Sequence, residues 1–320
     1  MKKSDLGLVC DVGGTNCRFA LAERGGAPIE AVASYRCSEF TDFAAAARRY
    51  LDEEGRGRKI SWSVVAVAGP VEENAVAMTN RPWRIEGASI ARDFKLRRVR
   101  LINDFSALAA ATPHLADAEL LAIGRTPVSA EGGTSAVVGP GTGLGVGVIV
   151  KNGSAPLVLP SEGGHAAFAP SDDLEREIAR VLVGRFDRVS YERLLSGEGL
   201  CNIYSSLAAI DGATAEDLAP RQISERATKG EDARAVAALG VFSRVLGAFS
   251  GDVVLMFGAR GGLYVAGGMM PQTLDVFDRA AFRARFEDKG RFRRFMEEIP
   301  AWVVVHPHAA LVGAAALAVD

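Results

Sequence analysis

The segment LVCDVGGTNCRFA, residues 8–20, decides the predicted fold of this chain. An apolar run ends at Asp11, two glycines and two short polar residues follow, and a second apolar run begins. A strand, a tight glycine turn and a strand form the pattern of a β-hairpin. Gly13 and Gly14 leave backbone N–H groups accessible to an anion, and Asp11 can hold a magnesium ion that bridges to phosphate. An ordinary hairpin turn with an exposed Asp explains this single segment equally well.

Length and composition indicate an ordinary globular protein. The 320 residues allow two domains with substantial cores. Hydrophobic residues make up 48% of the chain and charged residues 24%, which is typical of globular proteins. The formal net charge of −2 argues against a general nucleic-acid or acidic-membrane partner. We expect no signal peptide and no segment long and apolar enough to span a bilayer.

The four cysteines, Cys10, Cys17, Cys37 and Cys201, show no CxxC spacing. This usage fits a reducing cytoplasm, and it supplies no framework for a structural zinc ion.

Apolar spacing along the chain predicts helices and short buried strands. Helices are predicted over residues 40–51, 85–94, 106–111, 189–195, 200–209, 223–229, 233–257 and 306–318. Further strands are predicted over residues 31–35, 63–68, 99–102, 261–266 and 302–305. Continuous apolar runs of this kind are typical of strands that are covered on both faces.

A second strand–glycine–strand unit covers residues 135–150, SAVVGPGTGLGVGVIV. Gly141, Thr142 and Gly143 stand at its tip, and the spacing matches neither the dinucleotide-binding fingerprint nor the GxxxxGK[ST] phosphate loop. A glycine-rich hairpin packed against neighbouring backbone is the structural alternative. Two such hairpins, one in each half of the chain, indicate two related halves that together hold a polyphosphate.

An acid ends another predicted strand. Asn103 and Asp104 follow the apolar run at residues 99–102 and precede an Ala-rich helix. Open α/β sheets bind ligands at the carboxyl ends of their strands, so Asp104 stands where a functional acid is expected. The residues alone favour a simpler role for Asp104, that of a helix N-cap.

The middle of the chain offers partners for hydroxyl groups. Glu162 and His165 flank two glycines, and Glu192 lies on the helix predicted over residues 189–195. Carboxylates form strong charge-assisted hydrogen bonds with sugar hydroxyls. From the residues alone, a lone His such as His165 is more often structural or exposed than a ligand, and the simpler role of Glu192 is that of a solvated helical charge. Farther along, the pair Gly267-Gly268 fits a plain strand-to-helix turn.

Taken in order, these motifs resemble the superfamily of sugar kinases, actin and heat-shock-chaperone ATPases, and within it the bacterial ATP-dependent glucokinase family. The resemblance runs nearly end to end and rests on several stretches together. These are DVGGTN with Arg18, LINDFSA at 101–107, GPGTGLG, LPSEGGHAAFAP at 159–170, VSYERLLSGEGL at 189–200, AGG at 266–268 and FEDKGRF at 286–292. Cys10 stands where the family commonly has a small residue before the Asp.

The resemblance implies a two-domain α/β fold of the actin-like, ribonuclease H-like ATPase type with an interdomain cleft. The domains would be residues 1–114 with 305–320, a smaller α/β domain, and residues 115–304, a larger one. It implies a glucokinase that transfers the γ-phosphate of ATP to the 6-hydroxyl of glucose, with Asp104 as general base. The implied glucose-binding residues are Asn103, Glu162, His165 and Glu192. The implied ATP-binding residues are Asp11, Gly13, Gly14, Thr15, Asn16, Gly141, Thr142, Gly143, Gly267 and Gly268.

The resemblance also implies cofactors and partners. ATP and Mg²⁺ are expected, with Asp11 near the metal directly or through water, in a cytoplasmic, homodimeric enzyme of glycolysis. Relatives with structural zinc carry a Cys-rich segment after the His, whereas Ala-Ala-Phe-Ala-Pro follows His165 here, so no structural zinc is expected. Two alternatives remain open: a kinase for mannose, fructose or an amino sugar, and a sugar-sensing regulator. Such regulators usually carry a DNA-binding segment before the first glycine loop, where this sequence has only residues 1–5.

Overall fold

The structure, a computed structural model, describes residues 5–25, 28–78, 81–125, 133–150 and 156–318. Its internal contacts divide the chain into two units, Met1–Asp117 with His306–Asp320, and Ala118–Val305. The division expected from the sequence falls after residues 114 and 304. Each unit has its own mixed sheet and its own apolar core.

The sheet of the first unit has the strand order β3-β2-β1-β4-β7. Strands β1, β2 and β3 pair antiparallel, whereas β1, β4 and β7 run parallel. The strands are β1 (Leu6–Val12), β2 (Asn16–Glu23), β3 (Glu30–Arg36), β4 (Ile60–Val67) and β7 (Arg98–Asn103), and a separate hairpin joins β5 (Ala75–Ala77) to β6 (Arg84–Glu86). The hairpin predicted for residues 8–20 is therefore β1 and β2.

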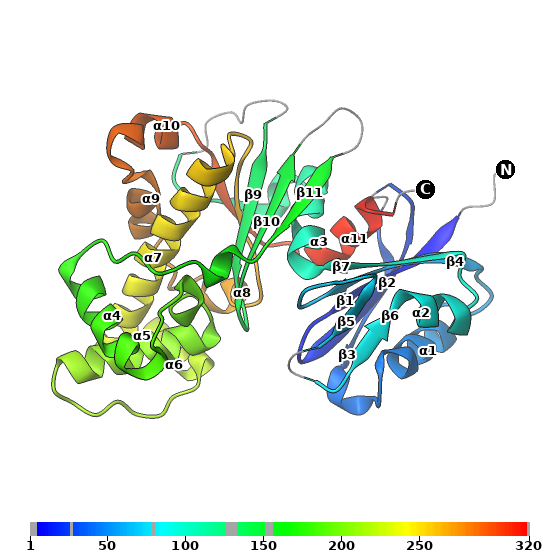
Figure 1. The fold of residues 1–320 in the computed structure, drawn as a ribbon, viewed down its shortest axis with the longest axis horizontal. Coiled ribbons are helices and arrows are strands. Elements are labelled where there is room, and N and C mark those ends of the chain that lie inside the picture. Colours follow the sequence, from blue (N-terminus) through cyan, green and yellow to red (C-terminus); the bar gives the residue numbers. More distant parts are fainter. Residues whose placement is uncertain (1–4, 26–27, 79–80, 126–132, 151–155, 319–320) are drawn as a thin grey trace. The chain divides into compact units, whose positions relative to one another are not determined.

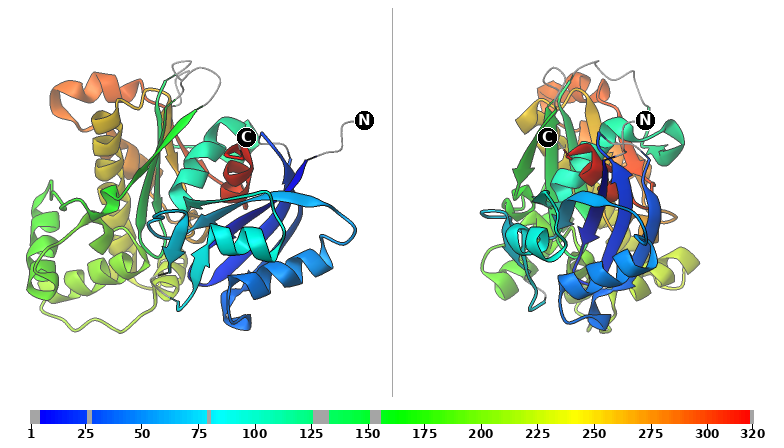
Figure 2. Two further views of the ribbon diagram at one scale, coloured as in Figure 1. Left: turned by 45° about the vertical axis from the view of Figure 1, so that its right-hand side comes forward. Right: turned by 90° about the vertical axis from the view of Figure 1, so that its right-hand side faces the viewer.

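Helices cover both faces of this sheet (Figures 1 and 2). On one face lie α1 (Phe43–Glu53) and α2 (Gly87–Asp93), and on the other lie α3 (Asp104–Ala111) and α11 (Ala309–Ala316). The 3₁₀ turns η1 (Cys37–Glu39) and η2 (Thr112–His114) belong to this unit, and η3 (Asp117–Glu119) leads into the next. Under α1, the Phe19 and Tyr50 rings stack with centroids 5.2 Å apart. Burial on both faces explains why β1 and β4 are almost continuously apolar.

The sheet of the second unit has the order β11-β10-β9-β12-β13-β8. Its strands are β8 (Leu120–Ala122), β9 (Ser135–Pro140), β10 (Leu144–Val150), β11 (Leu157–Ser161), β12 (Gly262–Val265) and β13 (Ala301–Val304). Strands β9, β10 and β11 pair antiparallel, whereas β9, β12 and β13 run parallel. This arrangement repeats that of the first unit, with β8 added at one edge, so the two halves inferred from the paired glycine hairpins share one topology.

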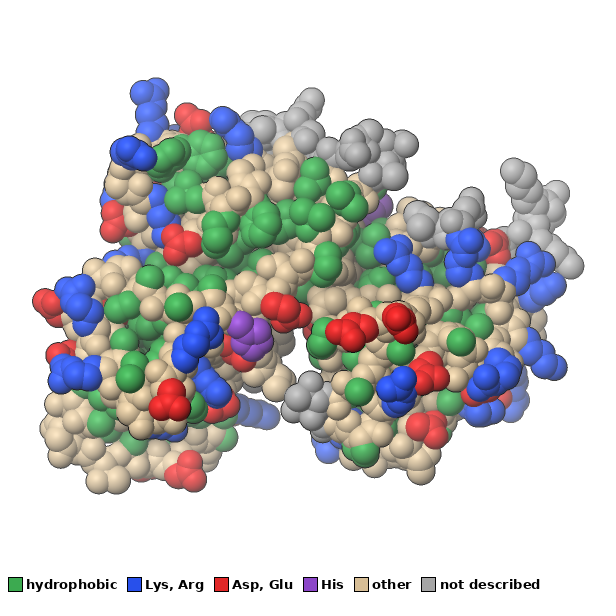
Figure 3. Space-filling model, viewed as in Figure 1, with side chains coloured by type: hydrophobic (Ala, Val, Ile, Leu, Met, Phe, Trp, Pro, Cys, Tyr) green, Lys and Arg blue, Asp and Glu red, His purple; other side chains and the backbone are tan. Residues whose placement is uncertain are grey.

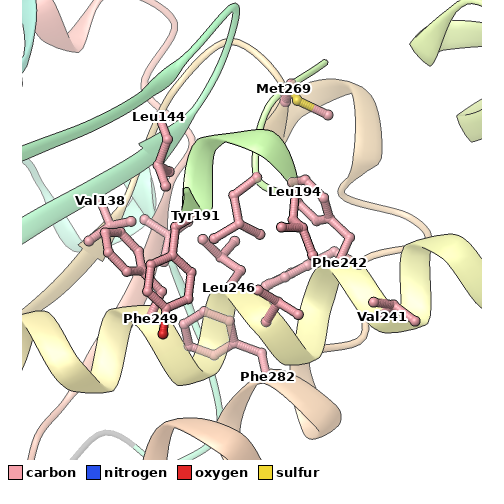
Figure 4. Close-up of a cluster of buried hydrophobic side chains, with 14 of the residues drawn as sticks. Val138, Leu144, Tyr191, Leu194, Val241, Phe242, Leu246, Phe249, Met269 and Phe282 are labelled. Carbon is pink, nitrogen blue, oxygen red and sulfur yellow. The ribbon is translucent and has the colours of Figure 1, made fainter. Parts of the chain in front are cut away.

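Helices pack on this second sheet around one long central helix. They are α4 (Asp173–Phe186), α5 (Gly197–Ile210), α6 (Pro220–Lys229), α7 (Ala233–Phe257), α8 (Met270–Thr273), α9 (Arg279–Glu287) and α10 (Arg293–Glu297). The 3₁₀ turns are η4 (Gly163–His165), η5 (Tyr191–Arg193) and η6 (Gly290–Phe292). Figure 4 shows side chains from α7, α9, β9 and the η5 segment meeting in one apolar cluster.

Helix α7 corrects one expectation from the sequence. It is long and apolar enough to cross a bilayer, with a mean hydropathy of 1.5 over its best window, although none was expected. However, 72% of that window is buried inside the unit. A helix that is apolar on most sides can be either a membrane span or the core helix of a large domain, and burial supports the second explanation here.

Other predicted elements differ at their ends or in type. Residues 85–94 divide into the end of β6 and then α2, and residues 189–195 form the short turn η5 in place of a helix. Helix α4 lies in a stretch for which no element was predicted. Its N-cap is Asp172, whose side chain accepts a hydrogen bond from Glu175 N.

Candidate functional site

The parallel strands of the first unit bring two predicted motifs to one edge of the sheet. In the register of the sheet, Val12 pairs with Val67, and Val67 pairs with Asn103. The carboxyl ends of β1, β4 and β7 therefore lie side by side. The first glycine loop follows β1, and Asp104 follows β7, so both stand at the edge where open α/β sheets bind ligands.

Neighbouring groups hold the first glycine loop through its carbonyl oxygens. Asn16 O accepts from Gly13 N at 3.0 Å, and Thr15 O accepts from Cys37 N at 2.9 Å. Gly14 O accepts from the Arg81 guanidinium at 2.7 Å. Three loop carbonyls are thereby engaged, and the Gly13 N–H is used inside the loop, so the N–H groups of Gly14 and Thr15 are what the loop can offer to an anion.

Asp11 forms an ion pair with Arg18 on the neighbouring strand. Arg18 Nη1 donates to Asp11 Oδ2 at 2.8 Å, and the Asp11 side chain is 16% exposed. Among the described residues, no group of three or more His, Cys, Asp or Glu side chains could hold a metal ion. Mg²⁺ needs only one or two carboxylates when phosphates and waters complete its shell. The site therefore fits a magnesium ion that Asp11 contacts through one oxygen or through water.

His308 lies near this ion pair, at the start of α11. Burial, followed by the positive charges of Arg18 and His306, lowers the pKa of His308 below its usual range. Its Nδ1 is buried, and no hydrogen-bond partner is found for that atom among the described residues. Neutral imidazole is therefore the favoured state of His308 beside Asp11.

Asn103, and not Asp104, caps helix α3. Asn103 Oδ1 accepts from Phe105 N at 2.9 Å and from Ser106 N at 3.2 Å, with extended backbone at Asn103. This arrangement corrects the reading in which Asp104 is the cap, because Asp104 is the first residue inside the helix. Asn103 Nδ2 donates to Gly69 O at 3.4 Å, and an amide nitrogen carries a second hydrogen that a ligand could accept.

In the second unit, the second glycine loop and the Gly267-Gly268 pair lie together. Strand β12 runs parallel beside β9, so both segments follow the carboxyl ends of adjacent strands. Gly267 has φ +107°, and a Cβ there would stand 2.6 Å from Pro140 O. A Cβ on Gly141 would stand 3.9 Å from Gly268 N. Only glycine fits position 267, and the approach leaves backbone groups of both segments side by side.

Glu162, His165 and Glu192 form a cluster in the second unit. His165 Nδ1 lies 3.7 Å from Glu192 Oε1, and His165 Nε2 lies 4.0 Å from Glu162 Oε2. The side chains of Glu162 and His165 are 69% and 58% exposed, whereas that of Glu192 is 28% exposed. Acceptors and a donor-acceptor that face solvent in this way suit a ligand with several hydroxyl groups.

Glu192 also connects this cluster to the second glycine loop. Its Oε2 accepts from Leu144 N at 2.9 Å, at the start of β10. A Cβ on Gly143 would stand 2.4 Å from that same oxygen, so the loop needs glycine where the carboxylate passes. Glu192 and Thr142 line one small open pocket, together with Arg193, Ser196, Glu198 and Asn202.

Two contacts at the site had no signal in the sequence. Arg81 reaches the Gly14 carbonyl from a distant part of the chain, and its guanidinium lies 5.6 Å from the centre of the Trp83 ring. Arg188 Nη2 donates to His165 O at 2.9 Å. Each is one of many arginines, and only the folded backbone shows which of them meets a loop.

Comparison with known proteins agrees with the family that the motifs resemble. The family model described as glucokinase matches residues 8–320. The glucokinase of Caulobacter vibrioides strain NA1000 / CB15N is 44% identical over 314 residues, covering 97% of this chain and 94% of its own. The glucokinase of Marinobacter nauticus is 41% identical over 317 residues, covering 98% of both.

Solved structures agree with the observed fold. The crystal structure of a glucokinase from an Antarctic psychrotroph has a TM-score of 0.87 and 34% identity, covering 98% of both chains. A ROK family glucokinase from Streptomyces griseus, solved with glucose and AMPPNP, is similar in fold with a TM-score of 0.66 and 20% identity, covering 98% of both chains. These likenesses confirm the expected two-domain α/β fold, which the structure builds on two mixed sheets. With a family model matched over almost its full length and relatives above 40% identity, the chain belongs to the glucokinase family.

Proposed function

We propose that this chain transfers the γ-phosphoryl group of ATP to the 6-hydroxyl of glucose, with Asp104 as the general base. Full-length similarity to curated glucokinases supports the reaction. The observation that carries the residue assignment is the position of Asp104, which follows β7 at the same carboxyl edge of the sheet as the first glycine loop. Phosphoryl transfer needs an oriented acceptor hydroxyl and donors for phosphate oxygens, and this edge offers an acid and loop amides.

The first unit supplies the base and one phosphate loop. Asp104 accepts the proton of the 6-hydroxyl as that oxygen attacks phosphorus. Asn103, held by its cap contacts, uses its amide N–H on a neighbouring hydroxyl. Gly13, whose N–H is bonded to Asn16 O, shapes the turn, and the N–H groups of Gly14 and Thr15, with the side chains of Thr15 and Asn16, bind phosphate oxygens.

The second unit supplies the sugar cluster and the other phosphate loop. Glu162, His165 and Glu192 accept and donate hydrogen bonds to the remaining hydroxyls, which orients the sugar. Gly141, Thr142 and Gly143 bind phosphate, and Gly267 with Gly268 lies against the nucleotide. The short connection from Glu192 to Leu144 N couples the two groups of residues.

Magnesium completes the charge balance of the reaction. When bound, Mg²⁺ neutralises phosphate charge, and Asp11 orients it through one carboxylate oxygen or through water. Arg18 holds Asp11 in place by the ion pair at 2.8 Å.

Asp104→Asn tests the assignment of the base. Turnover should fall by about a hundredfold or more, because Asn cannot accept the proton, while glucose KM and the melting temperature stay close to wild type. Asp42→Asn is the matched control, since Asp42 is the N-cap of α1 in the same unit and Asn caps equally well. Near-normal turnover in Asp104→Asn would remove Asp104 from the chemistry.

We also propose that glucose is preferred over mannose, fructose and amino sugars, and that the protein works in the cytoplasm as a homodimer without nucleic-acid partners. The curated relatives at 38–44% identity are glucokinases by name. Free cysteines suit a reducing compartment, and acidic and basic side chains are interspersed over the face in Figure 3. Coupled assays across the hexoses test the preference for glucose, and a higher kcat/KM for another hexose contradicts it. Light scattering after gel filtration tests the homodimer, and the mass of a monomer contradicts it.

A further inference from the structure

The motif FEDKGRF at residues 286–292 has no role in the reaction as proposed above. In the structure, its first residues end helix α9, and Lys289 stands between α9 and η6. The Lys289 side chain is only 11% exposed. Its Nζ donates to Asp252 Oδ1 at 2.6 Å and to Ala248 O at 2.8 Å, both on α7. These two partners compensate the positive charge of the buried ammonium group and fix its position.

Two glycines of α7 allow Lys289 to come this close. A Cβ on Gly247 would stand 2.2 Å from Phe282 O, and a Cβ on Gly251 would stand 2.5 Å from Lys289 Cε. The backbone of α9 therefore packs directly on α7 at this crossing. The ammonium group reaches the α7 backbone because no side chain stands between the two helices there.

Asp252 connects Lys289 to the η5 turn. Its second oxygen, Oδ2, accepts from the Tyr191 hydroxyl at 3.3 Å. Burial and the Asp252 carboxylate raise the pKa of Tyr191 to about 12, so its phenol stays protonated and donates. The Tyr191 ring contacts the ring of Phe168, with centroids 5.5 Å apart. It also packs on the ring of Phe249, with centroids 4.6 Å apart (Figure 4).

Tyr191 and Glu192 are adjacent residues of the same one-turn 3₁₀ helix. Tyr191 N donates to Ala166 O at 3.0 Å, one residue beyond His165, so η5 and η4 are also joined through the backbone. Glu192 then faces Leu144 N and His165 Nδ1. Fixing the Tyr191 ring therefore fixes the point from which the Glu192 carboxylate projects.

We propose that Lys289 is a positioning residue for the sugar: it holds Glu192 in place through Asp252 and Tyr191, without touching the substrate. This inference rests on the proposed function, because it takes Glu192 as a sugar ligand. It assigns Lys289 of the FEDKGRF motif a role in glucose affinity, rather than in nucleotide binding or in folding alone.

The test compares three variants in the full-length protein. Lys289→Met keeps the length of the side chain and removes its charge, Tyr191→Phe removes one hydroxyl, and the double variant combines the two. Lys289→Met should raise glucose KM about 3- to 30-fold and leave ATP KM within about twofold, the size expected for a residue that acts through intermediates. Tyr191→Phe should shift glucose KM in the same direction. Because both act through one chain of contacts, the double variant should resemble Lys289→Met rather than show the product of the two effects.

Arg283→Met provides the matched control. Arg283 is a buried cation of α9, the helix that precedes Lys289, and its side chain is 9% exposed. Its partners are Glu287 and the carbonyls of Ile299, Met296 and Glu297. None of these lies in the path to η5. This variant should lower the melting temperature while glucose KM stays at the wild-type value, which separates positioning from stability.

Three results would overturn the proposal. The first is a Lys289→Met protein with a lowered melting temperature and wild-type glucose KM, and the second is a double variant whose effects multiply. If Lys289→Met does not fold, an unchanged glucose KM in Tyr191→Phe is the third. Glu192→Gln, measured alongside, separates the two levels. If it leaves glucose KM unchanged, the assignment of Glu192 fails; if it raises glucose KM and Lys289→Met does not, only the positioning role fails.

Discussion

Replacing Glu192 by Gln and by Ala should separate two functions of one side chain. Its Oε2 accepts from Leu144 N at 2.9 Å, which fixes the end of the second glycine loop. Its Oε1 lies 3.7 Å from His165 Nδ1, on the side of the proposed sugar cluster. A substitution that keeps one of these functions and weakens the other should change one Michaelis constant and not both.

The expected magnitudes follow from these contacts. Gln keeps a carbonyl oxygen for Leu144 N but loses the negative charge that strengthens hydrogen bonds to sugar hydroxyls. That loss is about 1 kcal/mol, so Glu192→Gln should raise glucose KM about fivefold and leave ATP KM within about twofold. Ala leaves the N–H of Leu144, a residue 5% exposed, without its acceptor. An unsatisfied buried donor costs about 1–3 kcal/mol, so Glu192→Ala should raise both constants, each about fivefold or more.

Initial rates with glucose and ATP varied independently, together with a melting curve, measure these effects. Glu198→Gln is the control, because Glu198 lines the same pocket but is 62% exposed and pairs with Arg193 at 3.4 Å. It should leave both constants unchanged. Two results refute the reasoning: an ATP KM that stays at the wild-type value in Glu192→Ala, or a glucose KM that stays there in Glu192→Gln while the melting temperature drops.

Other predictions concern the glycine loop, the metal and pH. Gly143→Ala should raise glucose KM several-fold, because its Cβ would meet Glu192 Oε2 at 2.4 Å. Gly184→Ala is the control and should leave glucose KM unchanged, because a Cβ there has no atom within 4 Å. Equal kinetics in the two variants would contradict this prediction. EDTA should abolish activity and Mg²⁺ restore it, and elemental analysis after dialysis should find no zinc; one zinc per chain refutes the absence of a structural site. Because the pKa of His308 is lowered in the folded state, the unfolded chain binds that proton first as pH falls. The free energy of unfolding should therefore fall as the pH drops below about 6.5, the ordinary pKa of His. Between about pH 7.5 and 5.5, the urea midpoint should drop less in His308→Gln than in the wild-type protein. An equal drop in the two proteins argues against this role of His308.

The sequence predicts the elements whose signals are local. The glycine hairpin at residues 8–20, the strand before Asn103 and the whole of α7 follow from apolar runs and turn residues near one another in the chain. The sequence does not decide whether α7 is a core helix or a membrane span, because a continuous apolar helix has the same composition in both places. Only its neighbours in the folded unit decide between these two.

The sequence was less informative where neighbouring residues compete for one role. Both Asn103 and Asp104 can cap a helix, and the extended backbone at Asn103 decides the matter. The segment around Glu192 has helical spacing, but Ser196 accepts from Gly199 N and so begins α5 only after it, which leaves the short turn η5. The contact of Arg81 with Gly14 crosses 67 residues of sequence, and no periodicity indicates it.

The order of the two units along the chain has a consequence for synthesis on the ribosome. Residues 118–305 form one continuous unit, whereas the first unit needs α11, which follows them. A Cβ on Gly313 of α11 would stand 1.7 Å from Ala107 O of α3, so these two helices pack backbone to backbone over the sheet. Until α11 leaves the exit tunnel, the sheet face that it covers has no partner, while the second unit can already fold. The nascent chain thus presents an apolar surface through most of its translation, and this is the stage at which a chaperone would have its longest opportunity to bind.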